Sequence, residues 1–460
     1  MSSIQNSLQA TLLGWLTQRG LATSSELQKL TGKSQPTVSR ALAALTAQGV
    51  VTLGRGRATR YGLSKPILGS LLGQQPVWLH DTLGGVRRWG TLTWLAGNQL
   101  HVQTDGMEWL VKDSLPWFLA PLRLEGFLGR LRARATQLAA RVGDDPLRWS
   151  AEQQLYVAIA QGHEAPGAIT LGDPESASMA DPVPAADHER ALRYDEIAAN
   201  VAEHLPAGSS AAGEQPKFLV TRSLVTRRIA GAGPTAEWES LIVKFTPPRG
   251  TPFGERWHDL LHAEAIALRT LSEAGEPVAE ARVLSSDRRT YLESVRFDRI
   301  GHHGRRHVVP LWAVQEAFVS GSTGPRWTST CDELERQRRL STEDAQRVRL
   351  WRLFGELIGN NDMHAGNLSL WADDPASGRF SLAPCYDMLP MAYKPEPVRE
   401  DFGILPLTFL RPVVFDTAAW AQARELALHF WQQLAAHEGC GENMRAVAAE
   451  NARRVAGLAA

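Results

Sequence analysis

The sequence has little cysteine, and the cysteines present do not pair by spacing. Its 460 residues include three, Cys331, Cys385 and Cys440, which lie far apart and form no CxxC pair. This pattern excludes a disulfide framework and gives no sign of a structural zinc site. Reduced thiols are typical of proteins in a reducing compartment, so we expect a cytoplasmic protein.

Long apolar runs are also absent. No window approaches the roughly 18 apolar residues that a membrane span needs. The first residues lack a charged segment followed by an apolar one. We therefore expect a soluble chain with neither a membrane partner nor a targeting segment. With 43% hydrophobic and 21% charged residues, its length suits roughly two to four domains, each with its own core.

Net charge is lacking overall, because 49 Lys and Arg balance 49 Asp and Glu, but the charge is unevenly distributed. Residues 1–65 hold eight Lys and Arg against one acidic residue, Glu26, a net charge of +7. A basic segment on an otherwise acidic chain is typical of a part that binds a polyanion. This segment therefore favours nucleic acid as a partner.

The basic segment carries the pattern of a winged helix, which we place at residues 1–66. Apolar residues at helical spacing predict a first helix that Gly20 ends. A Thr-Ser-Ser-Glu capping box at 23–26 opens a second helix, and a third follows from Ser34. The stretch 50–61 then predicts a hairpin with a tip rich in glycine and arginine. Two closely spaced helices followed by such a hairpin indicate a winged helix-turn-helix.

Side chains on the third helix and on the hairpin could contact DNA. Those off the apolar stripe of the helix can reach base edges in the major groove, and those of the hairpin can contact phosphates. The candidates are Gln35, Thr37, Ser39 and Arg40 on the helix and Arg55, Arg57 and Arg60 on the hairpin. The alternative is a winged helix that makes only protein contacts, against which the charge imbalance argues. Winged helices often read paired half-sites, which favours a homodimer.

Residues 76–170 predict a small β-rich subdomain. Short runs at 77–79, 90–95 and 99–102 alternate or stay apolar, and glycines separate them, which predicts an antiparallel sheet. Helical material follows near 151–160, and the small, polar residues of 172–187 predict an exposed loop. The tryptophans of this region, including Trp89, Trp94 and Trp109, are expected in its core.

The most informative stretch is Asn-Asp-Met-His-Ala-Gly-Asn at 361–367, which places Asp362 five residues before Asn367. The kinase catalytic loop has the same Asp-x-x-x-x-Asn spacing, in which the aspartate accepts the substrate hydroxyl proton and the asparagine binds magnesium. Asp387 follows twenty residues later, after an apolar run, where a second magnesium ligand would follow a short hairpin. Alone, each of these residues could equally shape a turn.

Upstream residues supply the remaining parts of a nucleotide site. Lys244 lies inside the apolar strand pattern 241–245, and ATP phosphates and Glu264 of the following helix would give it partners. The small-residue loop 208–217, which holds Ser210 and Gly213, could lie over the phosphates. Each feature also has a plainer interpretation, such as a snorkelling lysine or a linker. Their order along the chain, however, is the kinase order.

With these motifs, the sequence resembles the HipA family of serine/threonine kinases, which includes toxins of toxin–antitoxin systems, over roughly residues 76–440. The most specific matches are Ser-Ala-Ala-Gly-Glu-Gln-Pro-Lys at 210–217, Val-Arg-Phe-Asp-Arg at 295–299, the stretch 361–367 and Tyr-Asp at 386–387. The resemblance implies ATP and Mg²⁺ as cofactors. It also implies a protein substrate, such as an aminoacyl-tRNA synthetase or another translation factor.

The resemblance further implies roles for single residues. They are Asp362 as the catalytic base, Asn367 and Asp387 as magnesium ligands, Lys244 as a phosphate contact, the backbone of Val295 to Phe297 as the adenine hinge, and Ser210 as the site of autophosphorylation. A phosphate on Ser210 would add about −1.5 to −2 charges beside the triphosphate and repel ATP or displace the loop.

Two features fit this family less simply. His364 would support either the transition state or the loop, and the Asp-x-His-x-x-Asn form also resembles lipid and small-molecule phosphotransferases. HipA toxins usually pair with a separate antitoxin that carries a different helix-turn-helix, whereas here a winged helix is fused to the kinase. The antitoxin partner therefore stays open.

Together these patterns predict an α+β protein. We expect a winged helix, a small β-rich subdomain and a bilobal body like that of a protein kinase, with the small lobe at 190–300 and a helical lobe at 301–460. The expected function is an autophosphorylating serine/threonine kinase with a DNA-binding head. Two alternatives remain: a transcriptional regulator whose kinase-like body only senses a ligand or partner, and a small-molecule phosphotransferase.

Overall fold

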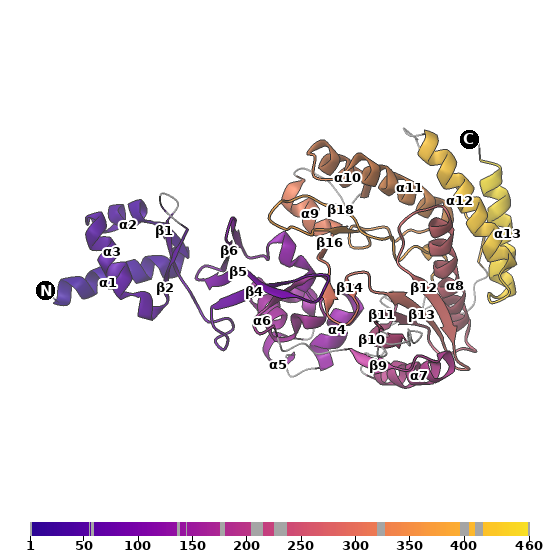
Figure 1. Ribbon diagram of the computed structural model, residues 1–460, viewed down its shortest axis with the longest axis horizontal. Coiled ribbons are helices and arrows are strands. Elements are labelled where there is room, and N and C mark those ends of the chain that lie inside the picture. Colours follow the sequence, from indigo (N-terminus) through magenta and orange to yellow (C-terminus); the bar gives the residue numbers. More distant parts are fainter. Residues whose placement is uncertain are drawn as a thin grey trace, which may run out of the picture.

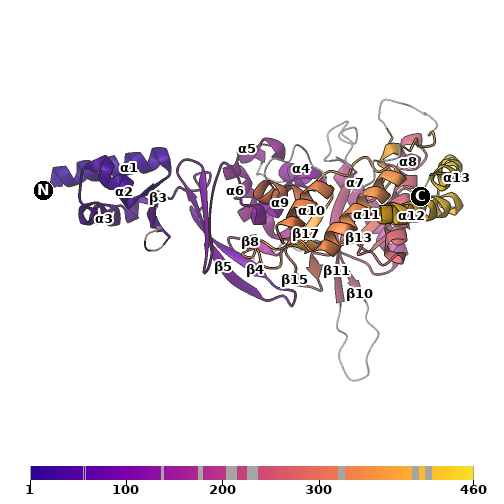
Figure 2. The same cartoon turned by 90° about the horizontal axis from the view of Figure 1, so that it is seen from above.

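A computed structural model of the chain describes residues 2–54, 56, 59–135, 139–143, 145–174, 180–203, 215–224, 237–319, 327–395, 404–409 and 417–458. Three parts follow one another along the long axis of the molecule (Figure 1), and the view from above shows the same order (Figure 2). A helical N-terminal part comes first, a β-rich part follows, and a larger body of sheet and helices forms the far end. The α+β class predicted from the sequence is confirmed.

The N-terminal part is a winged helix. Its elements are α1 (Ser2–Arg19), β1 (Leu21–Thr23), α2 (Ser24–Thr31), α3 (Gln35–Ala44), η1 (Thr46–Gln48), β2 (Val50–Leu53) and β3 (Arg60–Leu63), and its sheet has the order β1-β3-β2. The capping box forms as predicted, because Thr23 caps α2 and the Glu26 carboxylate accepts from the Thr23 amide at 2.7 Å. Leu12, Leu16 and Val38 are fully buried, so the predicted apolar stripes form its core.

The winged helix is joined to the next part by backbone contacts. The Ala96 amide donates to the Leu63 carbonyl at 2.8 Å, and the Lys65 amide donates to the Trp94 carbonyl at 3.0 Å. Ala96 is buried within the winged-helix core. Gly20 has a positive φ of 77°, and a Cβ there would lie 2.2 Å from the Ala96 carbonyl oxygen, so this close approach requires glycine.

The β-rich part is a five-stranded sheet of order β7-β6-β5-β4-β8, with helices packed on it. Its strands are β4 (Gln74–His80), β5 (Val86–Leu95), β6 (Gln99–Thr104), β7 (Glu108–Lys112) and β8 (Ile169–Leu171). Its helices are η3 (Trp117–Leu122), α4 (Gly126–Ala135), α5 (Ala139–Val142), η4 (Pro146–Arg148), α6 (Ala151–Gln161) and η5 (Gly162–Glu164). Trp89 and Trp94 are buried in its core, and Trp109 packs against that core, as the sequence predicts.

The small lobe of the body is a second five-stranded sheet, of order β12-β13-β11-β10-β9. Its elements are β9 (Asp181–Val183), α7 (Asp187–Glu203), β10 (Lys217–Leu224), β11 (Glu237–Phe245), α8 (Pro252–Glu273), β12 (Ala281–Ser285) and β13 (Thr290–Val295). Strand β9 falls in the stretch predicted as a loop. It pairs in parallel with β10 at the sheet edge, and only Val183 of its three residues is buried, so its sequence has no strand pattern.

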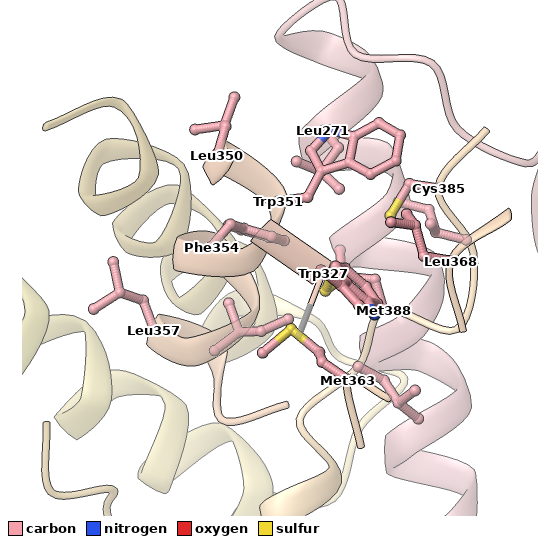
Figure 3. Close-up of a cluster of buried hydrophobic side chains, with 14 of the residues drawn as sticks. Leu271, Trp327, Leu350, Trp351, Phe354, Leu357, Met363, Leu368, Cys385 and Met388 are labelled. Carbon is pink, nitrogen blue, oxygen red and sulfur yellow. The ribbon is translucent and has the colours of Figure 1, made fainter. Parts of the chain in front are cut away.

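The large lobe is mostly helical. Its elements are β14 (Arg299–Ile300), β15 (Gly304–Arg305), β16 (Val308–Pro310), α9 (Leu311–Phe318), α10 (Trp327–Arg336), α11 (Thr342–Ile358), β17 (Ser369–Trp371), β18 (Ser381–Leu382), η7 (Met391–Tyr393), α12 (Thr417–Ala436) and α13 (Glu442–Ala456). Its core contains Trp327, Trp351 and Phe354, and Leu271 from the end of α8 packs there too (Figure 3). Helix α8 of the small lobe is thereby held in the core of the large lobe.

Candidate active site

A buried lysine joins the two lobes. Lys244 lies in β11, and its ammonium is 2.6 Å from Glu264 Oε1 of α8 and 2.6 Å from Asp387 Oδ1, which follows β18 in the large lobe. Lys244 is 5% exposed and Glu264 2% exposed. Side chains alternate along β11, so Lys244 points away from its buried neighbour Val243, which packs with α7. The sequence prediction of a lysine–glutamate pair is thus met in the geometry, and Asp387 joins it.

The electrostatics of this trio fix its charge state. Burial opposes the charge on Lys244, but Asp387 and Glu264 outweigh it and raise the pKa of the ammonium. Burial likewise opposes ionisation of Asp387, but Lys244 and Lys217 lower the pKa of its carboxyl to about 2. Lys217 lies opposite Lys244 in the register of β10 and β11, so the two side chains share one face of the sheet. The site therefore holds an ionised aspartate beside an ammonium.

Asp387 is held in an unusual backbone conformation. Its φ is +52°, in the left-handed region that non-glycine residues seldom adopt. Cys385, two residues earlier, is held by two backbone hydrogen bonds, because its amide donates to the Pro277 carbonyl and its carbonyl accepts from the Ala279 amide, each at 2.9 Å. Such conformations persist where surrounding contacts determine them, and they cluster at functional sites. Here they aim the carboxylate at Lys244.

The 361–367 stretch forms a tight loop between α11 and β17. Asn367 Nδ2 donates to the Asp362 carbonyl at 2.9 Å, which brings together the two residues of the Asp-x-x-x-x-Asn spacing. The Asp362 side chain is half exposed, in contrast to the buried Lys244. A carboxylate in this position can meet a hydroxyl group that arrives from solvent.

His364 takes part in the fold of this loop. Its Nδ1 accepts from the Gly366 amide at 3.0 Å, while its carbonyl accepts from the Trp327 indole of α10 at 2.8 Å. Its Nε2 lies 3.9 Å from Asp362 Oδ1, and about half of the side chain is exposed. These contacts favour the loop-supporting role of the two considered for His364.

Asn360 is a connecting residue that sequence reasoning missed. It is buried, its Oδ1 accepts from the Asp362 amide at 3.1 Å, and its Nδ2 donates to the Asp387 carbonyl at 3.3 Å. Asn360 thereby ties the loop of Asp362 to the segment of Asp387. The sequence holds one hint of this role, the position of Asn360 directly before Asn361 and Asp362. Its partner Asp387 lies 27 residues away, so the contact itself could not be predicted.

The predicted hinge segment is partly engaged in the fold. The Val295 amide donates to the Glu280 carbonyl and the Arg296 amide to the Ser240 carbonyl, each at 2.8 Å. Two of its three amides are therefore already used. The Phe297 ring lies 5.9 Å from the Tyr386 ring and 5.4 Å from the Trp371 ring, centroid to centroid. An adenine contact at this segment would fall on Phe297 and on the carbonyl groups.

The charged residues of the 295–299 motif bind the β-rich part to the body. Asp298 is buried and accepts from Arg296 at 2.9 Å, from Arg299 at 2.6 Å and from the Gly167 amide at 2.8 Å. Arg299 also donates to the Ala165 carbonyl at 2.7 Å. The charged residues of the motif therefore cross-link the predicted hinge segment to the loop after η5. The resemblance implies a hinge role for this motif but not this cross-link.

The remaining candidates divide into those that the structure describes and those that it does not. Gln35, Ser39, Arg40 and Arg60 are exposed and Thr37 is half-buried, while Val38 and Leu42 of the same helix are buried. The exposed side of α3 therefore carries the polar candidates. Ser210 and Gly213 of the predicted phosphate loop and Arg55 and Arg57 of the hairpin tip lie outside the described residues, so their roles stay predictions.

Comparisons with known proteins agree with this arrangement. A model of the HipA-like C-terminal domain matches residues 209–457, more than half of the chain. The chain belongs to the HipA family. A model of the middle domain of YjjJ-like toxins matches residues 71–180, and a MarR family model matches residues 4–60. This member of the HipA family is 34% identical over 448 residues to Toxin YjjJ of Escherichia coli (strain K12), covering 95% of both chains.

Solved structures resemble this HipA-family chain more distantly. A chain of the complex of Shewanella oneidensis MR-1 HipA, HipB and operator DNA is 15% identical, with a TM-score of 0.48, and the match covers 83% of this chain and 95% of that one. The Helicobacter pylori proinflammatory kinase CtkA is 12% identical, with a TM-score of 0.33, covering 52% and 97%. The family assignment does not depend on either. Within the described residues, no helix is both long and apolar enough to cross a membrane.

Proposed function

We propose that the chain is an ATP- and Mg²⁺-dependent serine/threonine protein kinase with a DNA-binding head. The observation that carries the proposal is the Lys244 ammonium, 2.6 Å from carboxylates on both lobes. A buried lysine between a helix glutamate and an aspartate that follows the catalytic loop is the arrangement that kinases use to hold nucleotide phosphates. Membership of the HipA family supports the same reaction.

The residues at the site suit a nucleotide with magnesium. The Asp387 carboxylate and the Asn367 amide oxygen are hard oxygen ligands of the kind that Mg²⁺ takes. Because Asn367 Nδ2 donates to the Asp362 carbonyl, its amide oxygen is left as an acceptor. When bound, the metal would neutralise charge on the phosphates, a task that Lys244 shares. Val295 to Phe297 would bind the adenine.

Asp362 is the proposed catalytic base. Phosphoryl transfer depends mostly on positioning and electrostatic stabilisation, so the base need only orient the attacking hydroxyl and accept its proton. Asn360 and Asn367 hold the loop that carries Asp362, and its exposed carboxylate faces the solvent from which a protein substrate arrives. By family resemblance, a translation factor such as an aminoacyl-tRNA synthetase is the proposed substrate class, and Ser210 is the proposed site of autophosphorylation.

The winged helix is proposed to bind DNA. Its net charge of +7 over residues 1–65, the exposed polar side of α3 and the match to the MarR family support this. Gln35, Thr37, Ser39 and Arg40 would lie in the major groove, and Arg60 would contact the backbone beside it. The E. coli relative is named a toxin. We propose the same for this chain, through phosphorylation of its substrate.

One experiment separates this proposal from its alternatives. Purified chain would be incubated with labelled ATP, Mg²⁺ and cell extract, alongside the Asp362→Asn variant. A kinase labels protein bands, and the variant labels none while unfolding at the same temperature, because the Asp362 side chain is half exposed. Label in small molecules alone would indicate a small-molecule phosphotransferase. DNA binding without ATP turnover would indicate a regulator with a sensing body.

A further inference from the structure

A small polar cavity lies where the β-rich part, the small lobe and the β14–β15 hairpin meet. Its volume is about 150 Å³, and its walls include His80 of β4, Glu164 of η5, Ser240 of β11, Arg299 of β14 and Arg305 of β15. None of these residues belongs to the candidate active site. Drug-sized ligands and cofactors occupy pockets of about 300–1,000 Å³, so this cavity suits something much smaller.

The walls of the cavity carry more positive than negative charge. Arg299 and Arg305 line the cavity with one carboxylate, that of Glu164. Arg296 and Asp298 do not line the cavity but pair with Glu164 and Arg299, so the five charges together sum to +1. Arg296 and Arg299 share the Asp298 carboxylate, at 2.9 and 2.6 Å. Glu164 lies 3.3 Å from Arg296. Both carboxylates are thus already engaged by the other two arginines.

Among the described residues that line the cavity, Arg305 is the cation that forms no ion pair, although Glu164 and Asp298 attract it from a longer distance. It is 9% exposed, and the one hydrogen bond that its side chain makes to the described residues goes to the His163 carbonyl, at 2.8 Å. No carboxylate of the described residues lies within ion-pair distance of it. A buried charge without a partner is costly, and a guanidinium has five N–H donors to satisfy. Arg305 lines the cavity, where an anion could accept from its guanidinium.

Other features of the cavity also favour an anion. Burial and the repulsion from Arg296 lower the pKa of Arg299 to about 9, and burial lowers the pKa of Arg305 as well. An anion in the cavity would relieve this excess of positive charge. Ser240 and Thr221 are cross-strand partners in the cavity wall. The Thr221 hydroxyl already donates to the Ala180 carbonyl at 3.0 Å, so Ser240 is the one of the two that can add a hydroxyl donor.

We propose that this cavity binds one oxyanion of the size of phosphate, with Arg305 as its principal ligand. The anion is either free inorganic phosphate or the phosphate group of a small phosphate monoester, since the shared chemistry is a tetrahedral group that accepts several charge-assisted hydrogen bonds. The site stands apart from the proposed nucleotide site and does not depend on kinase activity.

Calorimetric titration of the full chain with inorganic phosphate tests this proposal. We expect one site per chain in the wild type and in Lys244→Met, and a loss of affinity of at least about tenfold in Arg305→Gln, the effect of removing a charge-assisted hydrogen bond. The matched control is Arg306→Gln, because Arg306 is the next residue but pairs with Asp373 and stacks on Trp371 outside the cavity. The control should bind phosphate like the wild type.

Two results would overturn the site. The first is the absence of any heat of binding when the wild type is titrated up to about 10 mM phosphate. This concentration, about 10 mM, is well above the Kd of a specific site of useful affinity. The second is binding that Lys244→Met abolishes and Arg305→Gln leaves unchanged, since this would place the anion in the nucleotide site. A parallel titration with glycerol phosphate identifies the source: tighter binding than phosphate indicates a monoester, and weaker binding indicates the free ion.

A second variant keeps the test valid if Arg305→Gln does not fold. His303 is exposed at the cavity wall, so His303→Ala should keep the fold. We expect it to weaken phosphate binding several-fold. Unchanged affinity in a folded His303→Ala, together with unchanged affinity in a folded Arg305→Lys, would also reject the cavity as the binding site, because the lysine cannot reproduce the guanidinium geometry.

Discussion

Asn360 links Asp362 to Asp387, because its amide oxygen accepts from the backbone of one and its amide nitrogen donates to the backbone of the other. A single buried side chain therefore connects the segments that carry the proposed base and the proposed metal ligand. Lys244 and Glu264 are joined to the same unit through the Asp387 carboxylate. One connected set of contacts thus spans β11, α8, the 361–367 loop and the segment after β18.

Replacing Asn360 should impair phosphoryl transfer without removing any group that touches the substrate. We expect Asn360→Ala to lower kcat for protein phosphorylation by about ten- to a hundredfold, with a smaller change in KM for ATP, because misplacing a reacting group costs rates of this order. Asn361→Ala is the matched control, since Asn361 is exposed. Equal losses in the two variants would argue against a positioning role for Asn360.

Removing the ammonium at Lys244 should destabilise the body. Lys244→Met leaves the Glu264 carboxylate buried without its partner, and breaking a buried pair in this way costs about 3–5 kcal/mol. The double variant Lys244→Met with Glu264→Leu should regain part of this free energy of unfolding, measured in urea, while neither variant transfers phosphate. A single variant as stable as the wild type would show that the pair is not buried in solution.

The cross-link at Asp298 should matter more than a surface ion pair. Asp298→Asn leaves Arg299 buried without a charged partner among the described residues and leaves Arg296 with Glu164 alone, and we expect a loss of about 3–5 kcal/mol in the free energy of unfolding. Asp373→Asn removes the exposed partner of Arg306 and should cost less than about 1 kcal/mol. Limited proteolysis should also cut the Asp298 variant sooner between the β-rich part and the body.

Buried histidines should make stability depend on pH. Burial lowers the pKa of His80 and of His307 to about 4 from 6.5, so both stay neutral in the folded chain while the unfolded chain takes up protons. Their contribution is full above pH 6.5 and is lost as the pH falls towards 4. The free energy of unfolding should therefore drop between pH 7.5 and 5. In His307→Gln this drop should be smaller, whereas the exposed control His188→Gln should leave it unchanged.

DNA binding through the winged helix should weaken with salt in a residue-specific way. Arg60→Ala should lower affinity for all duplexes and reduce the slope of log K against log salt by about 1, the effect of losing one phosphate contact. Arg453→Ala changes an arginine of α13 at the opposite end of the molecule (Figure 1) and serves as the control. Electrophoretic mobility shifts over a salt series measure the affinity and its salt dependence for each variant. Equal slopes in the wild type and Arg60→Ala would exclude a phosphate contact at Arg60.

Much of the fold could be predicted because its signals are local. The capping box at Thr23 and Glu26 and the apolar stripe through Val38 and Leu42 each occupy one or two helical turns, and all appear as expected. The pairing of Lys244 with Glu264 could be predicted from the order of motifs along the chain. Neither required knowledge of which distant segments meet.

The missed features all depend on distant contacts. From the sequence alone, Asn360 is an ordinary loop residue. Only the structure shows that its side chain donates to the Asp387 carbonyl. The sequence identifies Asp298 only as part of the 295–299 family motif, yet its carboxylate accepts a hydrogen bond from the Gly167 amide, 131 residues away. Strand β9 is recognisable only by its pairing with β10, since one buried residue in three gives no periodicity. Sequence patterns report burial along one element and say little about which element covers it.

The contacts at Ala96 fix the orientation of the winged helix relative to the β-rich part. A residue of the β5–β6 turn sits inside the winged-helix core, and the bridge between Ser64 and Leu95 continues the backbone bonding across the boundary. A head fixed on a duplex would consequently hold the proposed phosphotransfer site in one orientation around the DNA axis. Access of a large protein substrate would then be set by the geometry of the bound duplex as well as by the site itself.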